Sequence, residues 1–188
     1  MKILGAVIAG GASRRMGQDK TLMDFRGQPL IAHVAGRLAP QVDALVINAN
    51  GDATRFRFLD IRIVSDRYDI GTPLSGLHTA LAEAGENGFD AVVTVPCDGP
   101  FLPPDLVTRL KPAAPATAAS GGHVHYLTGL WTTDLLPLLE RELTSGLRRV
   151  MDWAALAKAR SVEWPVTSHD PFANLNTPQE FQAASKIF

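Results

Sequence analysis

The sequence predicts a three-layer α/β sandwich, in which helices cover both faces of a mainly parallel β-sheet. Apolar runs of strand length recur along residues 1–100, and such runs are typical of strands that are buried on both faces of a sheet. Stretches with helical periodicity separate these runs, and strands that alternate with helices form βαβ units. A chain of 188 residues can bury a sizeable core in one domain. We find no linker and no internal repeat, and we therefore expect a single domain over residues 1–188.

Strands are expected where these apolar runs occur. The first, KILGAVIAG, lies at residues 2–10, and the first half of the chain contains three more: ALVIN at 44–48, IRIVS at 61–65 and AVVTVP at 91–96. In the second half, small residues over 112–125 predict a strand and a loop. The run LTGLWTT, which follows directly, predicts another strand.

Helices are expected between and after these strands. Pro29 opens the stretch PLIAHVAGRLA, and proline suits the first turn of a helix. The stretch PLSGLHTALAEAG has apolar residues at helical spacing and ends at Gly85. Further helices are predicted over PPDLVTRL, DLLPLLEREL and RRVMDWAALAKA. Near the C-terminus, Thr177 and Glu180 have the spacing of a capping box, with Pro178 at the first helical position.

Each of the four early strands is followed by glycines or by a polar residue. Gly10 and Gly11 follow the first strand, Asn48 ends the second, Asp66 follows the third and Asp98 follows the fourth. The carboxyl ends of parallel strands meet at one edge of the sheet, and ligands of open α/β folds bind at that edge. The sequence therefore predicts a binding site there.

The loop after the first strand, AGGASRRMGQDK at residues 9–20, is rich in glycine and basic residues. It matches neither a Walker A loop nor a dinucleotide-binding fingerprint, because both motifs require a different spacing. Backbone amides in such a loop can form an anion-binding nest, and Lys20 adds a point charge. The loop therefore predicts a cradle for two or three phosphates. The alternative is a plain turn between a strand and a helix with a solvated run of charges.

Composition argues against several classes of partner. The net charge is −1, so no broad basic surface is expected to bind nucleic acid. The single cysteine excludes an internal disulfide and suits a reducing compartment, so we expect a cytoplasmic protein. No run approaches the roughly 20 apolar residues of a membrane-spanning helix, and the N-terminal run is short for a signal peptide. No pattern determines the oligomeric state, and a monomer is our working expectation.

The loop resembles LAGGxSxRMGxDK, the signature of nucleotidyltransferases with a glycosyltransferase-A-like, Rossmann-like fold. Segments spread over nearly the whole chain resemble, in the same order, molybdenum cofactor guanylyltransferases: GQPLIAHV, VINAN, GTPLSGL, VPCDGPFLPPDL, GLRRVM and NLNTPQE. One position departs from the family, since Tyr126 stands where a proline commonly follows the histidine. The resemblance implies transfer of GMP from GTP to the terminal phosphate of molybdopterin-bound molybdenum cofactor, with release of pyrophosphate.

The resemblance also implies roles for individual residues. Lys20, Asp98 and Arg15 are the expected catalytic residues, and Asp98 is the expected ligand of Mg²⁺, with Mn²⁺ as the alternative metal. A single carboxylate suffices for such a site, because Mg²⁺ is usually held by one or two carboxylates together with substrate phosphates and waters. The expected nucleotide-binding residues are Ile8, Ala9, Gly10, Gly11, Lys20, Asn48, Asp66 and Asp98.

Residues 1–100 are expected to bind the nucleotide and residues 101–188 the acceptor. The acceptor candidates are Arg148, Arg149, Asn174 and Asn176, while His125 is a weaker candidate. The two arginines have a plainer alternative as a solvated helix start, and His125 as an incidental loop histidine. Among the nucleotide-side residues, turn formation is the alternative for Asn48 and Asp66, and a helix cap or turn is the alternative for Asp98. Transient contacts with other cofactor-biosynthesis proteins or with acceptor apoenzymes are also implied.

Two other functions remain open on sequence alone. A sister enzyme, which transfers a cytidylyl group or acts on a sugar or terpenoid phosphate, would share the loop and Asp98. A non-catalytic nucleotide-binding module would bind nucleotide without releasing pyrophosphate. A GTPase switch is disfavoured, because the lysine spacing of the Walker A motif is missing.

Overall fold

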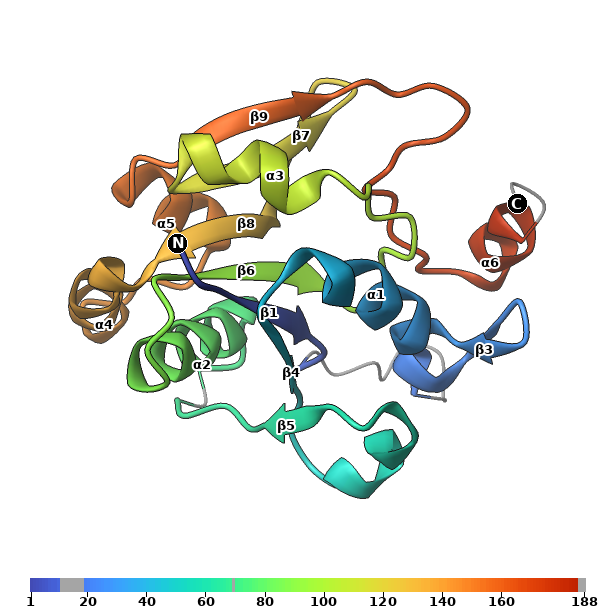
Figure 1. Ribbon diagram of the computed structural model, residues 1–188, viewed down its shortest axis with the longest axis horizontal. Helices are drawn as coiled ribbons and strands as arrows, with labels where there is room; N and C mark the ends of the chain where they lie inside the picture. The colour runs from blue at the N-terminus through green and yellow to red at the C-terminus, as the bar shows by residue number, and fades with distance from the viewer. Residues whose placement is uncertain (11–18, 69, 186–188) are drawn as a thin grey trace.

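The computed structural model, which describes residues 1–10, 19–68 and 70–185, confirms the α/β class (Figure 1). Its centre is a seven-stranded sheet with the order β5-β4-β1-β6-β8-β7-β9. β8 runs antiparallel to its two neighbours, and all the other pairs are parallel. The strands of this sheet are β1 (Ile3–Ile8), β4 (Ala44–Asn48), β5 (Arg62–Val64), β6 (Ala91–Pro96), β7 (Ala116–Ser120), β8 (His123–Thr132) and β9 (Arg160–Trp164).

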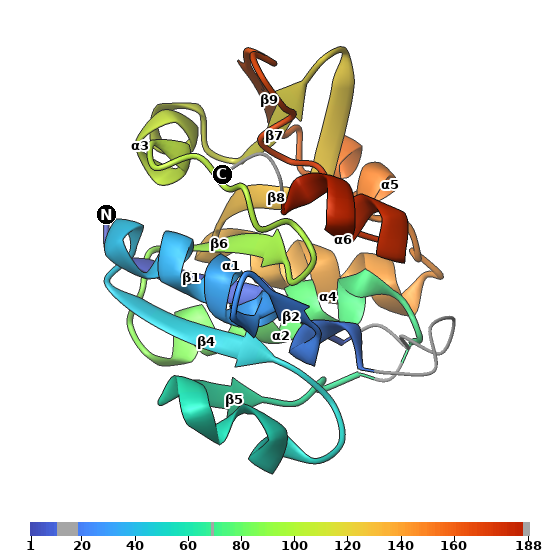
Figure 2. The same ribbon diagram turned by 90° about the vertical axis from the view of Figure 1, so that its right-hand side faces the viewer.

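Helices cover both faces of the sheet, as the predicted three layers require. Figure 2 shows α1 and α3 on one side of the strands and α2, α4 and α5 on the other. A short hairpin of β2 and β3 and the helix α6 lie beyond the sheet (Figure 1). The bounds are α1 (Leu30–Leu38), α2 (Pro73–Glu86), α3 (Leu106–Leu110), α4 (Leu136–Thr144), α5 (Val150–Leu156), α6 (Pro178–Ala184), β2 (Asp24–Phe25) and β3 (Gln28–Pro29).

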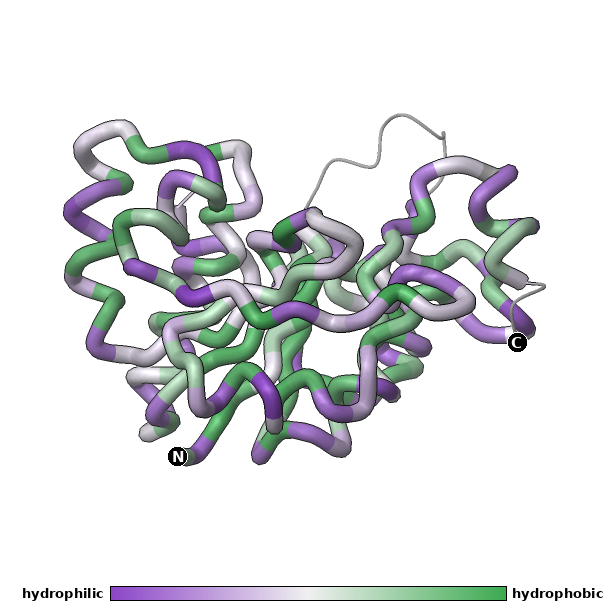
Figure 3. Tube along the Cα trace, turned by 90° about the horizontal axis from the view of Figure 1, so that it is seen from above, coloured by the Kyte–Doolittle hydropathy of each residue, from purple (hydrophilic) through white to green (hydrophobic). Residues whose placement is uncertain are grey.

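Two apolar layers cover the sheet, one on each face, and a smaller apolar cluster lies between the β2–β3 hairpin and α6. Val7 on β1 packs in the layer under α1, with Ile31 and Val34 of that helix, and Ala6 packs in the opposite layer with Leu77 of α2. Every residue of β1 is buried, because the strand is central and covered on both faces. Figure 3 shows apolar stretches through the middle of the molecule and polar ones on the peripheral segments.

The predicted strands and helices are present with somewhat different bounds, but one strand of the main sheet was not predicted. Pro29 lies just before α1 rather than inside it, and α3 begins at Leu106, after the prolines that we expected to open it. β9 was missed, because its sequence RSVEW is polar and lacks an apolar run. The edge of a sheet tolerates such a strand, since one side of it faces solvent. None of the described helices is long and apolar enough to cross a membrane.

The C-terminal segment passes the carboxyl ends of the strands before it enters α6. The predicted capping box at Thr177 and Glu180 is confirmed, with both reciprocal hydrogen bonds present. Phe181 of α6 packs edge-on against Phe25 of β2 at 6.2 Å between ring centroids. The amide of Leu175 donates to the carbonyl oxygen of Asp98 at 2.9 Å. These contacts hold the end of the chain against the edge where β6 ends.

Candidate active site

The carboxyl ends of β1, β4, β5 and β6 lie on one edge of the sheet, as predicted, because these four strands are parallel neighbours. Figure 2 looks at the molecule from the side toward which β1 and β6 run. Ile8 and Ala9 are buried where β1 ends, and the amide of Ala9 donates to the carbonyl oxygen of Asn48 at 2.8 Å. Of the predicted loop residues, Gly11 and Arg15 lie outside the described part of the chain.

Lys20 connects three parts of the chain that are far apart in sequence. Its ammonium group donates to Oδ2 of Asp98 at 2.8 Å and to Oδ1 of Asn176 at 2.7 Å. The residue is only 9% exposed, so the contact with Asp98 is a largely desolvated ion pair. The structure thus joins the predicted catalytic lysine and aspartate to Asn176, which was predicted on the acceptor side.

A short 3-10 helix, η2 (Lys20–Leu22), holds Lys20 in this position. Asp19 caps it by accepting from the amide of Thr21 at 3.1 Å. The second carboxylate oxygen of Asp19 lies 3.2 Å from a guanidinium nitrogen of Arg55. Arg55 also donates to the carbonyl oxygen of Asn50 at 3.1 Å, just past the end of β4. Arg55 was not predicted, since no local motif marks it, and it ties the segment of Lys20 to the neighbouring strand.

Asp98 has the properties that a divalent metal ligand requires. Oδ2 is paired with Lys20, whereas Oδ1 is buried and has no hydrogen-bond partner among the described residues. A buried carboxylate oxygen without a partner is costly, and a hard cation such as Mg²⁺ satisfies it well. The described residues contain no cluster of three or more metal-binding side chains. Asp98 supplies one free carboxylate oxygen, and Mg²⁺ commonly takes its remaining ligands from substrate phosphates and water.

Asn48 and Asp66, predicted to contact the nucleotide, hydrogen-bond to each other at the ends of β4 and β5. The amide of Asn48 donates to Oδ1 of Asp66 at 2.8 Å, and the amide of Asn50 donates to Oδ2 at 2.7 Å. The backbone amide of Asp66 returns a bond to Oδ1 of Asn50 at 2.9 Å. Asn50 was not predicted as a site residue. The network fixes both carboxylate oxygens of Asp66 beside Gly10, where a Cβ would lie 3.6 Å from Oδ2.

Asn48 itself is fully buried, and its Oδ1 has no hydrogen-bond partner among the described residues. This oxygen faces Gly76 in the first turn of α2, where a side chain at position 76 would collide with it. A Cβ at Gly76 would also lie 2.9 Å from Cγ2 of Ile8. The close approach of α2 to β1 and β4 therefore requires glycine at this position.

The predicted acceptor residues do not all meet at one place. Asn174 lies beside Gly99, where a Cβ would be 3.5 Å from its Oδ1, and it is therefore close to Asp98. Arg148 donates to the carbonyl oxygens of Leu143 and Leu147 and so completes the end of α4. Arg149 is exposed before α5. No hydrogen bond or ion pair of the described residues links either arginine to Lys20 or Asp98.

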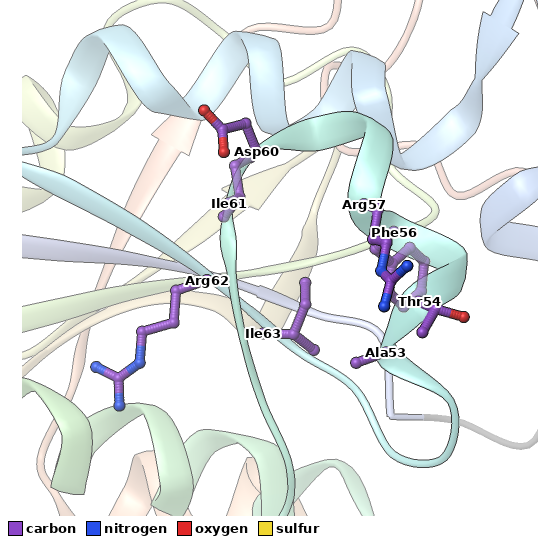
Figure 4. Close-up of a pocket in the computed structure, with 8 residues that line it drawn as sticks. All are labelled: Ala53, Thr54, Phe56, Arg57, Asp60, Ile61, Arg62 and Ile63. Carbon is purple, nitrogen blue, oxygen red and sulfur yellow. The ribbon is translucent and has the colours of Figure 1, made fainter.

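Two further features have no part in this site. A hollow of about 460 Å³ lies between the edge strand β5 and the 3-10 helix η4 (Ala53–Leu59), and Figure 4 shows the side chains around it. None of the predicted site residues lines it. Burial raises the pKa of the Cys97 thiol to about 12, so this residue is not a thiolate nucleophile at neutral pH.

Comparisons with known proteins agree with the fold and with the motifs. The family described as the MobA-like NTP transferase domain matches residues 5–160. The molybdenum cofactor guanylyltransferase of Rhodobacter capsulatus is 42% identical over 98% of this chain and 95% of that protein. The enzyme of the same name from Bradyrhizobium sp. (strain ORS 278) is 40% identical over 97% of this chain and 92% of that protein.

A solved structure supports the fold. It is that of molybdopterin-guanine dinucleotide biosynthesis protein A from Archaeoglobus fulgidus, which superposes with a TM-score of 0.72 and 24% identity, over 98% of this chain and 97% of that one. The fold, the order of the motifs and the full-length similarity all agree. The chain belongs to the molybdenum cofactor guanylyltransferase family and carries its MobA-like NTP transferase domain.

Proposed function

We propose that this enzyme transfers GMP from GTP to the terminal phosphate of molybdopterin-bound molybdenum cofactor. The observation that carries the proposal is the contact of Lys20, Asp98 and Asn176 at the carboxyl edge of the sheet. It places a buried ammonium group and a carboxylate oxygen with an unused lone pair next to the end of the glycine-rich loop. Family membership supports guanosine as the nucleoside.

The proposed reaction needs no general base. The attacking oxygen belongs to a phosphate monoester, which is already anionic near neutral pH. It forms a bond to the α-phosphorus of GTP as the bond to the bridging oxygen breaks, and pyrophosphate leaves with the electron pair. Repulsion between the two anions is the main obstacle, so positioning and positive charge should supply nearly all of the catalysis.

Asp98 would hold Mg²⁺ through its buried Oδ1, and the ion would draw charge from the phosphates when bound. Lys20 would stabilise the charge that develops on the departing pyrophosphate. Arg15 belongs to the proposal as a further cation, although it lies outside the described residues. Asn48 and Asp66 would contact the nucleoside from the ends of β4 and β5.

We propose that residues 101–188 bind the acceptor, with Asn174 and Asn176 near the reacting phosphates and Arg148 and Arg149 farther away. Asn176 would then face both substrates, because it already contacts Lys20. We also propose that the enzyme is a monomer in the cytoplasm. It would make transient contacts with other cofactor-biosynthesis proteins or with acceptor apoenzymes.

The decisive experiment measures pyrophosphate release from GTP, CTP, UTP and ATP, each with and without molybdopterin. We expect release from GTP in the presence of molybdopterin and Mg²⁺. We expect kcat/KM to be much lower for the other nucleotides, because polar groups that are built to pair with one base are left unpaired by another. Equal kcat/KM for CTP and GTP would contradict the proposal, as would nucleotide binding without any pyrophosphate release.

A further inference from the structure

A second polar cluster lies at the carboxyl edge of the sheet, on the far side of Asp98 from Asn48 and Asp66. Ser120 ends β7, which is separated from β6 by one strand, β8. The hydroxyl of Ser120 lies 2.7 Å from Nε2 of His125 and donates to Oδ1 of Asp170 at 2.6 Å. We call these three residues the Ser120 cluster. Two strand spacings of roughly 4.8 Å place it about 10 Å across the sheet from the end of β6.

The Ser120 cluster is not a nucleophilic triad. Ser120 is fully buried. Its hydroxyl bonds to both His125 and Asp170 and so lies in the middle of the hydrogen-bonded series, whereas a nucleophilic serine lies at its end. A serine nucleophile must instead donate its proton to the base. Here the proton is committed to Asp170, so the hydroxyl joins two side chains and fixes their positions.

The hydrogen bonds determine which atoms of the cluster remain available. Because the Ser120 hydroxyl donates its only proton to Asp170, Nε2 of His125 must carry the proton that it donates to Ser120. Burial lowers the pKa of His125, so the ring is neutral at pH 7 and Nδ1 is an acceptor. Oδ1 of Asp170 accepts a second bond, from the amide of Phe172 at 2.9 Å. No described residue donates to Oδ2 of Asp170 or to Nδ1 of His125.

Aromatic rings pack against the cluster, and the segment that carries Asp170 leads toward the reacting centre. The rings of His125 and Phe172 lie 5.0 Å apart, and Trp164 packs edge-on against Phe172 at 5.3 Å. His125 and Asp170 are only partly buried. A few residues farther along the same segment, Leu175 bonds to the backbone of Asp98. The cluster thus lies in the proposed acceptor half, and the segment that carries Asp170 also contacts the backbone of Asp98.

We propose that the Ser120 cluster is a specificity subsite that recognises the pterin ring of the acceptor through its N–H donors. The proposal rests on the function proposed above. The two available polar atoms, Nδ1 of His125 and Oδ2 of Asp170, both accept hydrogen bonds. The carboxylate of Asp170 repels phosphate. The cluster therefore suits a flat heterocycle that presents amino and ring N–H groups. A pterin presents such donors at its 2-amino group and the adjacent ring nitrogen. Guanine presents a similar pair, but Asn48 and Asp66 lie on the opposite side of β6.

Asp170→Asn is the variant that tests this subsite, because it changes the available atom and preserves the fold. The asparagine oxygen can still accept from Ser120 and Phe172, which places an NH₂ donor where Oδ2 was. The KM for molybdopterin should rise about 10- to 100-fold, as expected when a hydrogen-bonding group is left facing an unsuitable partner. The KM for GTP should change less than about two-fold. Retained binding of GTP would show that the variant is folded. Asp134→Asn is the matched control, since Asp134 is exposed beyond the opposite end of β8.

A binding measurement separates this inference from the proposed function. Pterin and lumazine differ at position 2, where lumazine has a carbonyl group in place of the amine. Wild-type protein should bind pterin at least several-fold more tightly than lumazine, and Asp170→Asn should lose this preference. If wild-type enzyme releases no pyrophosphate with GTP and molybdopterin, the proposed function fails, and the two pterin analogues still test the subsite. Equal affinity for pterin and lumazine would overturn the inference, as would an Asp170→Asn variant with an unchanged KM for molybdopterin or an increase confined to GTP.

Discussion

At the scale of single residues, the contact of Lys20 with Asp98 and Asn176 is the central feature of the site. A lysine that is 9% exposed has lost most of its hydration, so its position depends on the two oxygens that accept from it. In the absence of substrate these oxygens satisfy the ammonium group. Phosphate oxygens are equally good partners, and the same lysine can therefore serve a bound triphosphate.

Lys20→Ala should reduce kcat by about 10²- to 10³-fold, because it removes a positive group aimed at the charge of the leaving pyrophosphate. The measurement is pyrophosphate release at saturating GTP and molybdopterin. Lys111→Ala is the matched control, since Lys111 is exposed beside α3, and it should keep wild-type turnover. Near-normal turnover of Lys20→Ala would mean that the lysine has only a structural role.

At the scale of elements, the site depends on how closely α2 approaches the ends of β1 and β4. The helix carries two glycines in very different surroundings. Gly76 faces the buried oxygen of Asn48 and Cγ2 of Ile8, whereas a Cβ at Gly85 would meet nothing within 4 Å. Both glycines lie within the helix, and neither has a positive φ. The same substitution at the two positions therefore isolates the effect of packing.

Gly76→Ala should lower the free energy of unfolding by about 1–3 kcal/mol, because the added methyl group overpacks a close contact. It should also raise the KM for GTP, since Asn48 must move. Gly85→Ala should instead stabilise the protein by about 0.4–1 kcal/mol, because alanine has less freedom to lose on folding. Chemical denaturation of both variants measures these changes. A Gly76→Ala variant as stable as Gly85→Ala would show that α2 can shift without cost.

At the scale of the whole molecule, one sheet edge gathers residues from nearly the full length of the chain. β1, β4, β5 and β6 bring the first half to this edge, and the segment that ends in α6 brings Asn174 and Asn176. A ligand that bridges these parts binds only the folded protein. Its binding free energy therefore adds to the stability of the whole fold.

GTP with Mg²⁺ at 100 times its Kd should add about 2.7 kcal/mol of stability. For a chain of this size that corresponds to a rise of about 5–10 °C in Tm. Asp98→Asn should lose the part of this rise that depends on Mg²⁺ and should lose activity, because the amide removes the anionic anchor of the metal. Thermal unfolding with and without Mg²⁺ measures both effects, and Asp134→Asn serves as the control. A wild-type metal response in Asp98→Asn would contradict the assignment of this residue as the metal ligand.

The sequence by itself determined the α/β class, the order of the early strands and helices along the chain, and the sheet edge on which Asn48, Asp66 and Asp98 lie. These features depend on local signals: buried parallel strands are apolar along their whole length, and parallel strands end on one side. The capping box of α6 was equally readable, because its residues lie within one turn of helix.

Only the tertiary structure decided which distant side chains touch. The contact of Asn176 with Lys20, the tie from Arg55 to Asp19, and the hydrogen bonds that join Ser120, His125 and Asp170 all link residues from different elements. No periodicity or motif encodes such pairs, because they arise from the packing of elements against each other. The edge strand β9 escaped prediction for a related reason. Its polar sequence forms a strand because β7 offers it a row of hydrogen-bonding partners, which only the assembled sheet supplies.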